Sequence, residues 1–337
     1  MPEQSPKINF NLSLKSFTAK SDMIHTPEFK DIQKAHLLIQ KAVHRTPVIT
    51  SKSLNQITGS QLFFKCENFQ KVGAFKFRGA CNAVFSLSAK ESKKGVATHS
   101  SGNHAAALAL AARMCGVEAF IVMPVNAPEI KKQAVKGYGA KITFCQPTLQ
   151  ARESTLARIV ANTGATEIHP YNNFQVISGQ GTAAKELIED CGDLDMILAP
   201  VGGGGLVSGT AISTRNMLPG CKVIACEPEG ADDAFRSFKS NSLIPSENPK
   251  TIADGLLTSL GELTFAVIMN NVDDIVTVSE EKIVEAMRMI WERMKIIIEP
   301  SSAVPLAAIL EKKVDVRDKK VGIILSGGNV DLEKLPF

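Results

Sequence analysis

Short apolar runs rich in β-branched residues alternate with longer, alanine-rich amphipathic segments from about residue 95 onward. The short runs predict buried strands, and the longer segments predict helices, two of which end near Gly116 and Gly137. In the first block of this region the expected strands are 95–99, 118–123 and 141–145, and the expected helices are 103–115, 128–136 and 152–163.

A second block repeats the alternation. Its expected strands are 196–200, 223–226, 275–278 and 321–325, and its expected helices are 206–217, 280–296 and 302–312. Such alternation produces parallel strands joined by crossover helices. The sequence therefore predicts an α/β protein with two open parallel-sheet units. Because no Pro/Gly/Ser-rich linker separates the blocks, we expect the units to pack closely across a cleft and to exchange strands.

Composition narrows the class of protein. At 337 residues the chain exceeds the size at which one core usually stops growing, which agrees with two units. The 44% hydrophobic and 21% charged residues are typical of soluble globular proteins. A formal net charge of only +4, with lysines scattered among acids, argues against nucleic-acid binding. No apolar run approaches the roughly 20 residues that span a bilayer, so no membrane role is expected.

Cysteine usage and the N-terminus bear on location. The seven cysteines form no CxxC pair and cannot all be bridged, which favours buried, reduced thiols in the cytoplasm. The first residues are polar, include Glu3 and lack the apolar core of a secretory signal. We expect residues 1–22 to be a flexible extension, and a short organellar presequence stays open.

Four consecutive glycines, Gly202 to Gly205, separate a predicted strand from a predicted helix. Each costs up to about 1 kcal/mol relative to alanine, so the run needs a reason. Backbone without side chains can approach a phosphate and donate N–H groups at a helix start, although a tight turn is the alternative. Val207 and Ser208 stand where a dinucleotide fingerprint needs glycine, and no P-loop lysine follows. A mononucleotide or another monophosphate cofactor remains.

One lysine, Lys76, lies between Phe75 and Phe77 in a segment bounded by Gly73 and Gly79. A nucleophilic lysine must lose its proton near neutral pH, and apolar surroundings lower its pKa from about 10.4. The two phenylalanines supply such surroundings in this interpretation. The same alternation is also what a half-buried strand with a solvated lysine shows.

Two further turns follow predicted strands. Ser100-Ser101-Gly102-Asn103-His104 opens a predicted helix, where serine and asparagine are ordinary caps. Their hydroxyls and amide, together with the free N–H groups of the helix start, also form a carboxylate-binding turn for a free amino acid. Ser326-Gly327-Gly328-Asn329 follows the last strand, and a plain turn is as good an interpretation there.

An acidic loop, Glu227 to Asp233, follows another predicted strand. Mg²⁺ and Ca²⁺ take oxygen ligands of this kind, although acidic surface loops are more common than metal sites. The six histidines show no zinc-binding spacing, and no G-x-S-x-G motif occurs, which argues against a metalloprotease or an ordinary serine hydrolase.

The order of these motifs resembles that of fold-type II pyridoxal-phosphate enzymes, from about residue 30 to 332. The segments that resemble serine racemase and serine/threonine dehydratase are 63–67, 75–79, 99–104, 179–182 and 291–295. The resemblance implies two open parallel-sheet domains with helices on both faces, similar to the β subunit of tryptophan synthase. It implies a large cofactor-binding domain from 23–70 and 171–337, and a small domain from 71–170.

The resemblance also implies roles for residues around pyridoxal 5'-phosphate. Lys76 forms the covalent link to the cofactor, and Ser101 transfers a proton on the opposite face. The cofactor-binding residues are Phe75, Lys76, Asn103 at the 3-hydroxyl, Gly202, Gly203, Gly204 and Gly205 at the phosphate, and Ser326 at the pyridine nitrogen. The substrate-binding residues are Ser100, Ser101, His104 and Arg152. The ligands of Mg²⁺ or Ca²⁺, with Mn²⁺ as an alternative, are Glu227, the carbonyl of Ala231 and Asp233.

The implied reaction is elimination of water from L-serine, L-threonine or threo-3-hydroxyaspartate, giving a keto acid and ammonia. Serine racemisation is a side or main alternative, β-replacement is a second, and a non-covalent nucleotide-binding protein is an alternative of another class. Ala105-Ala106, where the family usually has Gly-Gln, and Tyr171, where racemases tend to have asparagine, favour elimination. We also expect a homodimer, an ATP-like effector as one option, and no regulatory domain after Phe337.

Overall fold

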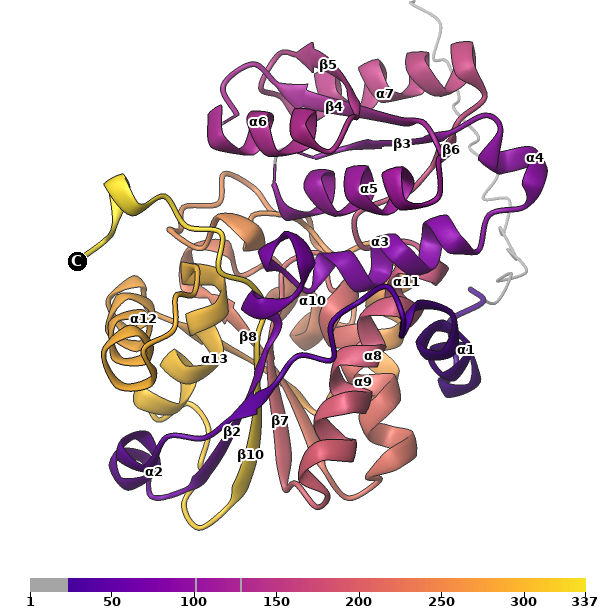
Figure 1. Cartoon of the computed structure of the whole chain (residues 1–337). Helices are drawn as coiled ribbons and strands as arrows, with labels where there is room; N and C mark the ends of the chain where they lie inside the picture. The colour runs from indigo at the N-terminus through magenta and orange to yellow at the C-terminus, as the bar shows by residue number, and fades with distance from the viewer. Residues whose placement is uncertain (1–23, 101, 128) are drawn as a thin grey trace, which may run out of the picture.

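The structure of the chain is a computed structural model that describes residues 24–100, 102–127 and 129–337. The predicted extension 1–22 and Ser101 lie outside these residues. Two sheets form the framework, the larger in the lower part of Figure 1 and the smaller in the upper part. The larger has the order β1 (Val48–Ile49), β2 (Gln61–Cys66), β10 (Lys320–Leu325), β7 (Met196–Pro200), β8 (Lys222–Pro228) and β9 (Asp274–Val278).

All neighbours in the large sheet are parallel except β1, which pairs antiparallel with β2. The small sheet is parallel throughout, in the order β5 (Lys141–Cys145), β4 (Ala119–Pro124), β3 (Val96–His99) and β6 (Thr166–Glu167). Since β2 precedes the whole small sheet in the chain but pairs with β10, the large sheet combines both ends of the chain. The strands of the two predicted blocks stay in separate sheets, so the expected exchange of strands between the blocks is wrong for the residues described.

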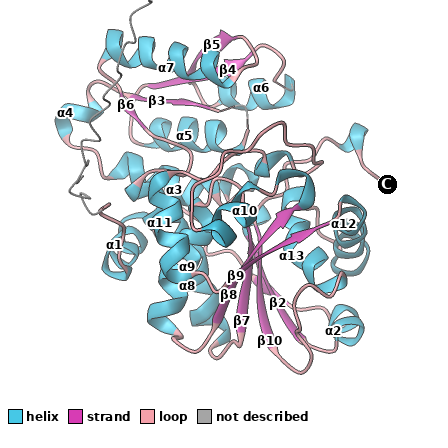
Figure 2. Cartoon of the chain, turned by 180° about the vertical axis from the view of Figure 1, so that it is seen from behind, coloured by secondary structure: helices cyan, strands magenta, loops and turns pink. Residues whose placement is uncertain are grey.

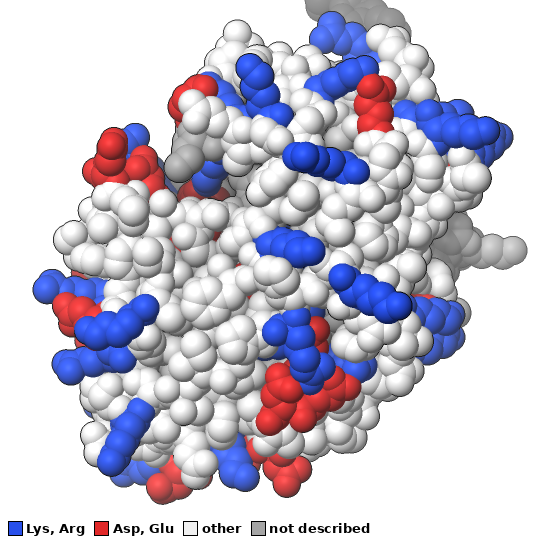
Figure 3. Space-filling model, viewed as in Figure 1, with Lys and Arg blue, Asp and Glu red and all other residues white. Residues whose placement is uncertain are grey.

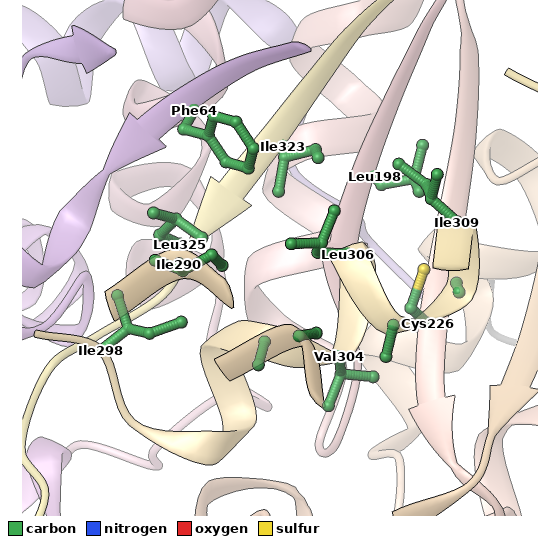
Figure 4. Close-up of a cluster of buried hydrophobic side chains, with 14 of the residues drawn as sticks. Phe64, Leu198, Cys226, Ile290, Ile298, Val304, Leu306, Ile309, Ile323 and Leu325 are labelled. Carbon is green, nitrogen blue, oxygen red and sulfur yellow. The ribbon is translucent and has the colours of Figure 1, made fainter. Parts of the chain in front are cut away.

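Helices cover both faces of the large sheet, as expected. Figure 2 shows α8 (Phe174–Cys191) and α9 (Gly205–Met217) on one side and α12 (Glu280–Met294) and α13 (Pro300–Leu310) on the other. In Figure 4 the side chains of Phe64, Leu198 and Ile323 on the strands pack with Leu306 and Ile309 on α13. The apolar strands are buried on both faces, which is why they read as continuous hydrophobic runs.

The small sheet is also covered on both faces. α3 (Lys76–Phe85), α5 (Asn103–Met114) and α6 (Glu129–Gly137) share one core with it, and α7 (Leu149–Thr163) packs on its other face. The remaining helices are α1 (Phe29–Ile39), α2 (Lys52–Thr58), α4 (Ala89–Ser92), α10 (Asp233–Ser240) and α11 (Glu262–Asn271). Short 3₁₀ turns occupy Glu67–Phe69, Lys71–Gly73, Glu229–Ala231, Asp254–Leu256 and Leu332–Lys334.

The predicted elements after residue 95 are present, with ends shifted by at most three residues. The strands at 141–145 and 196–200 have the expected bounds. α7 begins earlier than expected because the Thr148 hydroxyl accepts the Ala151 N–H and caps it, and α13 begins earlier because Pro300 suits a first helical position. Phe75-Lys76-Phe77 does not form a strand, since Lys76 begins α3.

The distribution of surface charge is as the composition predicts, and most but not all of the cysteines are buried as expected. Lysine and arginine side chains lie scattered among acidic and uncharged residues on the face shown in Figure 3. None of the helices that the structure describes is both long and apolar enough to cross a bilayer. All seven cysteines are unpaired and five are buried, but Cys115, after the last turn of α5, is exposed and Cys191 is only partly buried.

Candidate active site

Lys76 lies at the start of α3, with its amine between two aromatic rings. Its Nζ donates a hydrogen bond of 3.0 Å to the main-chain oxygen of Pro170. The ring centroids of Phe75 and Tyr171 lie 5.1 and 6.0 Å from Nζ. Burial lowers the pKa of Lys76 to about 8, against the opposing effect of the Glu299 carboxylate. A substantial fraction of the Lys76 amine is therefore neutral and nucleophilic near physiological pH.

Main-chain hydrogen bonds join the C-terminal turn to the segment that carries Lys76. The Phe75 N–H donates to the Ser326 carbonyl at 3.0 Å, and the Gly328 N–H donates to the Gly73 carbonyl at 2.9 Å. Gly73 has a φ of +69°, and a Cβ there would lie 2.5 Å from the Asn329 side chain, so only glycine fits. Two motifs that lie far apart in the sequence are thus hydrogen-bonded to each other.

The hydroxyl of Ser326 is buried where these two motifs meet. Its Oγ lies 3.0 Å from the Oγ of Ser302, which in turn donates to the Gly327 carbonyl at 2.7 Å. Ser302 stands in the first turn of α13, and its part in the site was not predicted. Ser326 is therefore a buried neutral hydroxyl, and its place at the pyridine nitrogen stays a prediction.

The tetraglycine loop lies beside Tyr171. A Cβ on Gly203 would come within 2.3 Å of the Tyr171 ring, and a Cβ on Gly202 within 2.9 Å of the Leu256 backbone. Gly204 has a φ of +86°, and Gly205 begins α9. The loop therefore needs glycine for steric reasons as well as for the phosphate suggested by its sequence. Tyr171 contacts this loop on one side and faces Lys76 on the other.

The Ser100 turn follows β3 and leads into α5. The Ser100 N–H donates to the Val122 carbonyl at 3.1 Å, and the Gly102 N–H donates to the Ser100 hydroxyl at 3.3 Å. Asn103, the first residue of α5, donates from Nδ2 to both oxygens of Glu299, at 3.0 and 3.1 Å. The main-chain N–H groups at this helix start are the chemistry expected of a carboxylate-binding turn.

His104 and Arg152 are two of the predicted substrate-binding residues. Their side chains make hydrogen bonds to main-chain carbonyls in the structure. His104 is buried, its Nε2 donates to the Ile168 carbonyl at 3.1 Å, and burial lowers its pKa to about 3. The ring is therefore neutral and offers no positive charge to a substrate. Arg152 lies on α7, where its Nε donates to the Thr148 carbonyl at 3.4 Å. Its substrate contact, and that of His104, stay predictions.

His169 is a site residue that sequence reasoning missed. Its Nδ1 accepts the Asn172 N–H at 2.9 Å, and its ring meets the Tyr171 ring edge-on at a centroid distance of 4.5 Å. Burial lowers its pKa to about 4, so the ring is neutral and its proton sits on Nε2. Pro170 and Tyr171 thus contact the Lys76 amine with a carbonyl and a ring, and His169 packs behind the Tyr171 ring. No sequence signal pointed to it beyond the His-Pro-Tyr order, because the short strand before it, β6, was not predicted.

Glu227 and Asp233, the predicted cation ligands, are both buried and lie together. Glu227 accepts the N–H groups of Ala234 and Phe235 at 3.0 and 2.8 Å, and burial raises its pKa to about 9. Neither carboxylate oxygen of Asp233 makes a hydrogen bond of good geometry in the part of the chain described. Burial raises its pKa to about 6, although Ser246 and the main chain of Leu260 lie near enough to oppose this rise. Within that part, no group of three His, Cys, Asp or Glu side chains converges. Two buried carboxylates, one of them unsatisfied, fit a cation that also takes a main-chain oxygen.

A buried ionic network anchors the helix that carries Lys76. Arg78 forms salt bridges of 2.7 Å with Glu67 after β2 and with Glu186 on α8, and Lys65 on β2 forms another of 2.7 Å with Glu186. Two cations and two anions balance, which is how such charges tolerate burial. Close packing of α3 on α8 also needs Gly179, where a Cβ would lie 2.6 Å from the Arg78 carbonyl.

Comparison with known proteins agrees with this geometry. A family model described as "Pyridoxal-phosphate dependent enzyme" matches residues 39–327. The β-hydroxyaspartate dehydratase of Paracoccus denitrificans (strain Pd 1222) is 52% identical, covering 93% of this chain and 100% of the relative. The serine racemase of Dictyostelium discoideum is also 52% identical, covering 92% and 97%. The structure of maize serine racemase is 46% identical, with a TM-score of 0.90 over 92% of this chain and 95% of the maize chain.

The fold, the buried lysine and these matches define a class of protein. The chain belongs to the family of pyridoxal-phosphate dependent enzymes. This confirms the predicted fold type and cofactor, and it replaces the alternative of a non-covalent nucleotide-binding protein. An amine of lowered pKa, a glycine loop at a helix start and a buried neutral hydroxyl are groups that fit pyridoxal phosphate.

Proposed function

We propose that this protein eliminates water from a small hydroxy-amino acid, L-serine, L-threonine or threo-3-hydroxyaspartate, to form a keto acid and ammonia. Serine racemisation is the second outcome of the same site. The observation that carries the proposal is the Lys76 amine, with a pKa lowered to about 8, held against Pro170 between two rings. Equal identity, 52%, to a dehydratase and to a racemase supports both outcomes.

Bound pyridoxal phosphate supplies the electron sink that lets an α-proton leave. In our proposal Lys76 would hold the cofactor through its Nζ, and the same Nζ in its neutral form would accept the α-proton of the substrate. Ser101 returns a proton on the opposite face when racemisation occurs. The proposed cofactor contacts are Phe75, Asn103, Gly202, Gly203, Gly204, Gly205 and Ser326. The proposed contacts of the substrate carboxylate are Ser100, Ser101, His104 and Arg152.

Two features favour elimination over racemisation. The neutral hydroxyl of Ser326 would not force protonation of a pyridine nitrogen as a carboxylate would, so negative charge at the α-carbon would be delocalised less. This would favour loss of the β-hydroxyl, which would take a proton from the cofactor phosphate or a nearby acid and leave as water. The Tyr171 ring, packed against Gly203, occupies space that a smaller asparagine would leave open. Elimination is therefore the outcome that we place first.

We extend the proposal to a divalent cation, Mg²⁺ or Ca²⁺ with Mn²⁺ as the alternative, held by Glu227, the Ala231 carbonyl and Asp233. The unsatisfied oxygens of Asp233 support it. The cation would neutralise two buried carboxylates next to α10 and thereby stabilise the loop that follows β8.

The proposal also covers the domain bounds, the oligomeric state, the location and an effector. We propose a large domain from 23–70 and 171–337 and a small domain from 71–170, which the membership of the two sheets supports. We also propose a homodimer, a cytoplasmic location and a nucleotide such as ATP as an effector. The family resemblance supports the dimer and the effector, and the unpaired cysteines agree with a reducing compartment.

Product analysis tests the activity. The purified protein is incubated with pyridoxal phosphate, Mg²⁺ and, separately, L-serine, L-threonine and L-threo-3-hydroxyaspartate, and keto acid and both enantiomers are measured. Dominant keto acid establishes a dehydratase and names its substrate, whereas abundant D-amino acid makes racemisation the main activity. Inactivity on all three, with a new product when a thiol is added, would establish β-replacement instead. Lys76→Ala should abolish every product, and Lys90→Ala, at an exposed lysine, should abolish none.

A further inference from the structure

Glu299 is a buried carboxylate beside the candidate active site to which the proposed mechanism assigns no role. It precedes α13, and its main-chain N–H donates to the Gly327 carbonyl at 3.0 Å. Both of its carboxylate oxygens accept from the Nδ2 of Asn103, at 3.0 and 3.1 Å. Among the residues that the structure describes, no cation lies within salt-bridge distance of Glu299. The amide of Asn103 is thus its side-chain partner, and the main chain of Asn329 also lowers the pKa of the carboxyl by hydrogen bonding.

This contact sets the orientation of the Asn103 amide. While Nδ2 faces Glu299, Oδ1 accepts from the Nδ2 of Asn329 at 2.9 Å. The Nδ2 of Asn329 also donates to the Val72 carbonyl at 2.7 Å, so it is fixed as a donor. A flipped Asn103 would place an oxygen against the Glu299 oxygens and a nitrogen against the Asn329 nitrogen. Neither flipped pair can form a hydrogen bond while Glu299 is ionised.

We propose that Glu299 is a positioning residue that fixes the Asn103 amide, so that its remaining N–H faces the 3-hydroxyl of the cofactor. The inference rests on the cofactor contact proposed for Asn103. It adds a group that acts on the reaction without touching the substrate or the cofactor. It also predicts that protonation of Glu299 weakens this orientation, because a protonated carboxyl can donate to a flipped Asn103 Oδ1 and only the contact with Asn329 then opposes the flip.

The surroundings of Glu299 place that protonation in the neutral range. Burial raises the pKa of Glu299 to about 7, and the negative charge of Asp254 on the adjoining turn adds to the effect. The hydrogen bond from Asn103 and the positive charge of Lys131 on α6 oppose it. Lys76 is the charged group of α3 that interacts with Glu299. The carboxyl therefore changes charge within the pH range in which the enzyme would work.

The test follows the absorbance of the bound cofactor against pH, without substrate. In the wild type we expect a spectral step with a midpoint near the pKa of Glu299, about 7. Glu299→Gln keeps an oxygen that accepts the Asn103 N–H but cannot ionise, so it should bind the cofactor and lack this step. Glu281→Gln, at an exposed glutamate on α12, is the matched control and should keep the step.

Kinetics separate a positioning role from a merely structural one. Glu299→Ala should lower kcat about tenfold with little change in KM, the size expected when an orienting charge-assisted hydrogen bond is lost. In an Asn103→Ala background it should have no further effect, because Glu299 acts through Asn103. A spectral step that survives in Glu299→Gln, or a Glu299→Ala variant that loses only thermal stability, would overturn the inference. A colourless wild type would instead overturn the proposed function.

Discussion

The Nζ of Lys76 donates a hydrogen bond of 3.0 Å to the main-chain oxygen of Pro170, which lies 94 residues further along the chain. Pro170 follows the last strand of the small sheet and precedes α8 of the large one. The reactive amine is therefore placed where segments belonging to the two sheets meet. An amine held by a carbonyl and two rings is positioned before any cofactor arrives, and this arrangement has a measurable pH dependence.

Reloading of the apoprotein with pyridoxal phosphate should depend on pH through Lys76. Covalent attachment needs the neutral amine, and burial lowers the pKa of Lys76 from 10.5 to about 8. The rate of cofactor uptake should therefore rise as pH approaches 8 and then level off, as followed by absorbance in a stopped-flow instrument. A rate that keeps rising toward pH 10.5 would show that the lysine is solvated and unperturbed.

The buried network around Arg78 should dominate the stability of the site. Glu186→Gln removes the negative charge that Arg78 and Lys65 share and leaves an unbalanced buried positive charge. We expect the free energy of unfolding in urea to fall by about 3–5 kcal/mol. Glu189→Gln, on the same helix but at a partly exposed pair with Arg45, should cost about 0–1 kcal/mol. Equal effects of the two substitutions would contradict this account.

The ring of Tyr171 should influence the ratio of products. Tyr171→Asn removes the ring that packs on Gly203 and leaves the α-carbon more time to be reprotonated. We expect the ratio of racemised to eliminated serine to rise about threefold, which corresponds to about 0.65 kcal/mol between the two barriers. Tyr171→Phe keeps the ring and should leave the ratio near that of the wild type. If both variants change it equally, the hydroxyl rather than the ring is responsible.

Removal of divalent cations should change how stability depends on pH. Burial raises the pKa of Glu227 to about 9 and that of Asp233 to about 6. Without a cation the folded protein then binds more protons than the unfolded chain, so its free energy of unfolding falls as pH rises through this range. Mg²⁺ favours the ionised carboxylates and should reverse the loss, which thermal unfolding with EDTA or Mg²⁺ at about pH 6 and about pH 8 measures.

Asp233→Ala provides the control for the cation. This variant should still bind pyridoxal phosphate, because its carboxylate belongs to the loop after β8 rather than to the cofactor-binding groups. It should lose the Mg²⁺-dependent rise in Tm. A variant that responds to Mg²⁺ as the wild type does would place the cation elsewhere or remove it from the proposal.

The pattern of apolar runs predicted the strands and most of the helices after residue 95. Strands such as 141–145 and 196–200 were predicted to the residue because each is a short β-branched run bounded by turn residues. The Lys76 segment, the tetraglycine loop and the two polar turns were found as motifs, since glycine runs and an apolar setting for a lysine are local features. The sequence alone thus determined which chemistry the chain carries.

The tertiary structure decided how that chemistry is held. The partner of Asn103 is Glu299, the partner of Lys76 is the Pro170 carbonyl, and Arg78 meets Glu186. Each pair lies about a hundred residues or more apart, and no local periodicity encodes such contacts. Phe75-Lys76-Phe77 illustrates the same limit, because its alternation suits a strand while its packing against α8 makes it a helix start. Local pattern reports what a short segment can become, and close packing between distant segments selects which of those forms is stable.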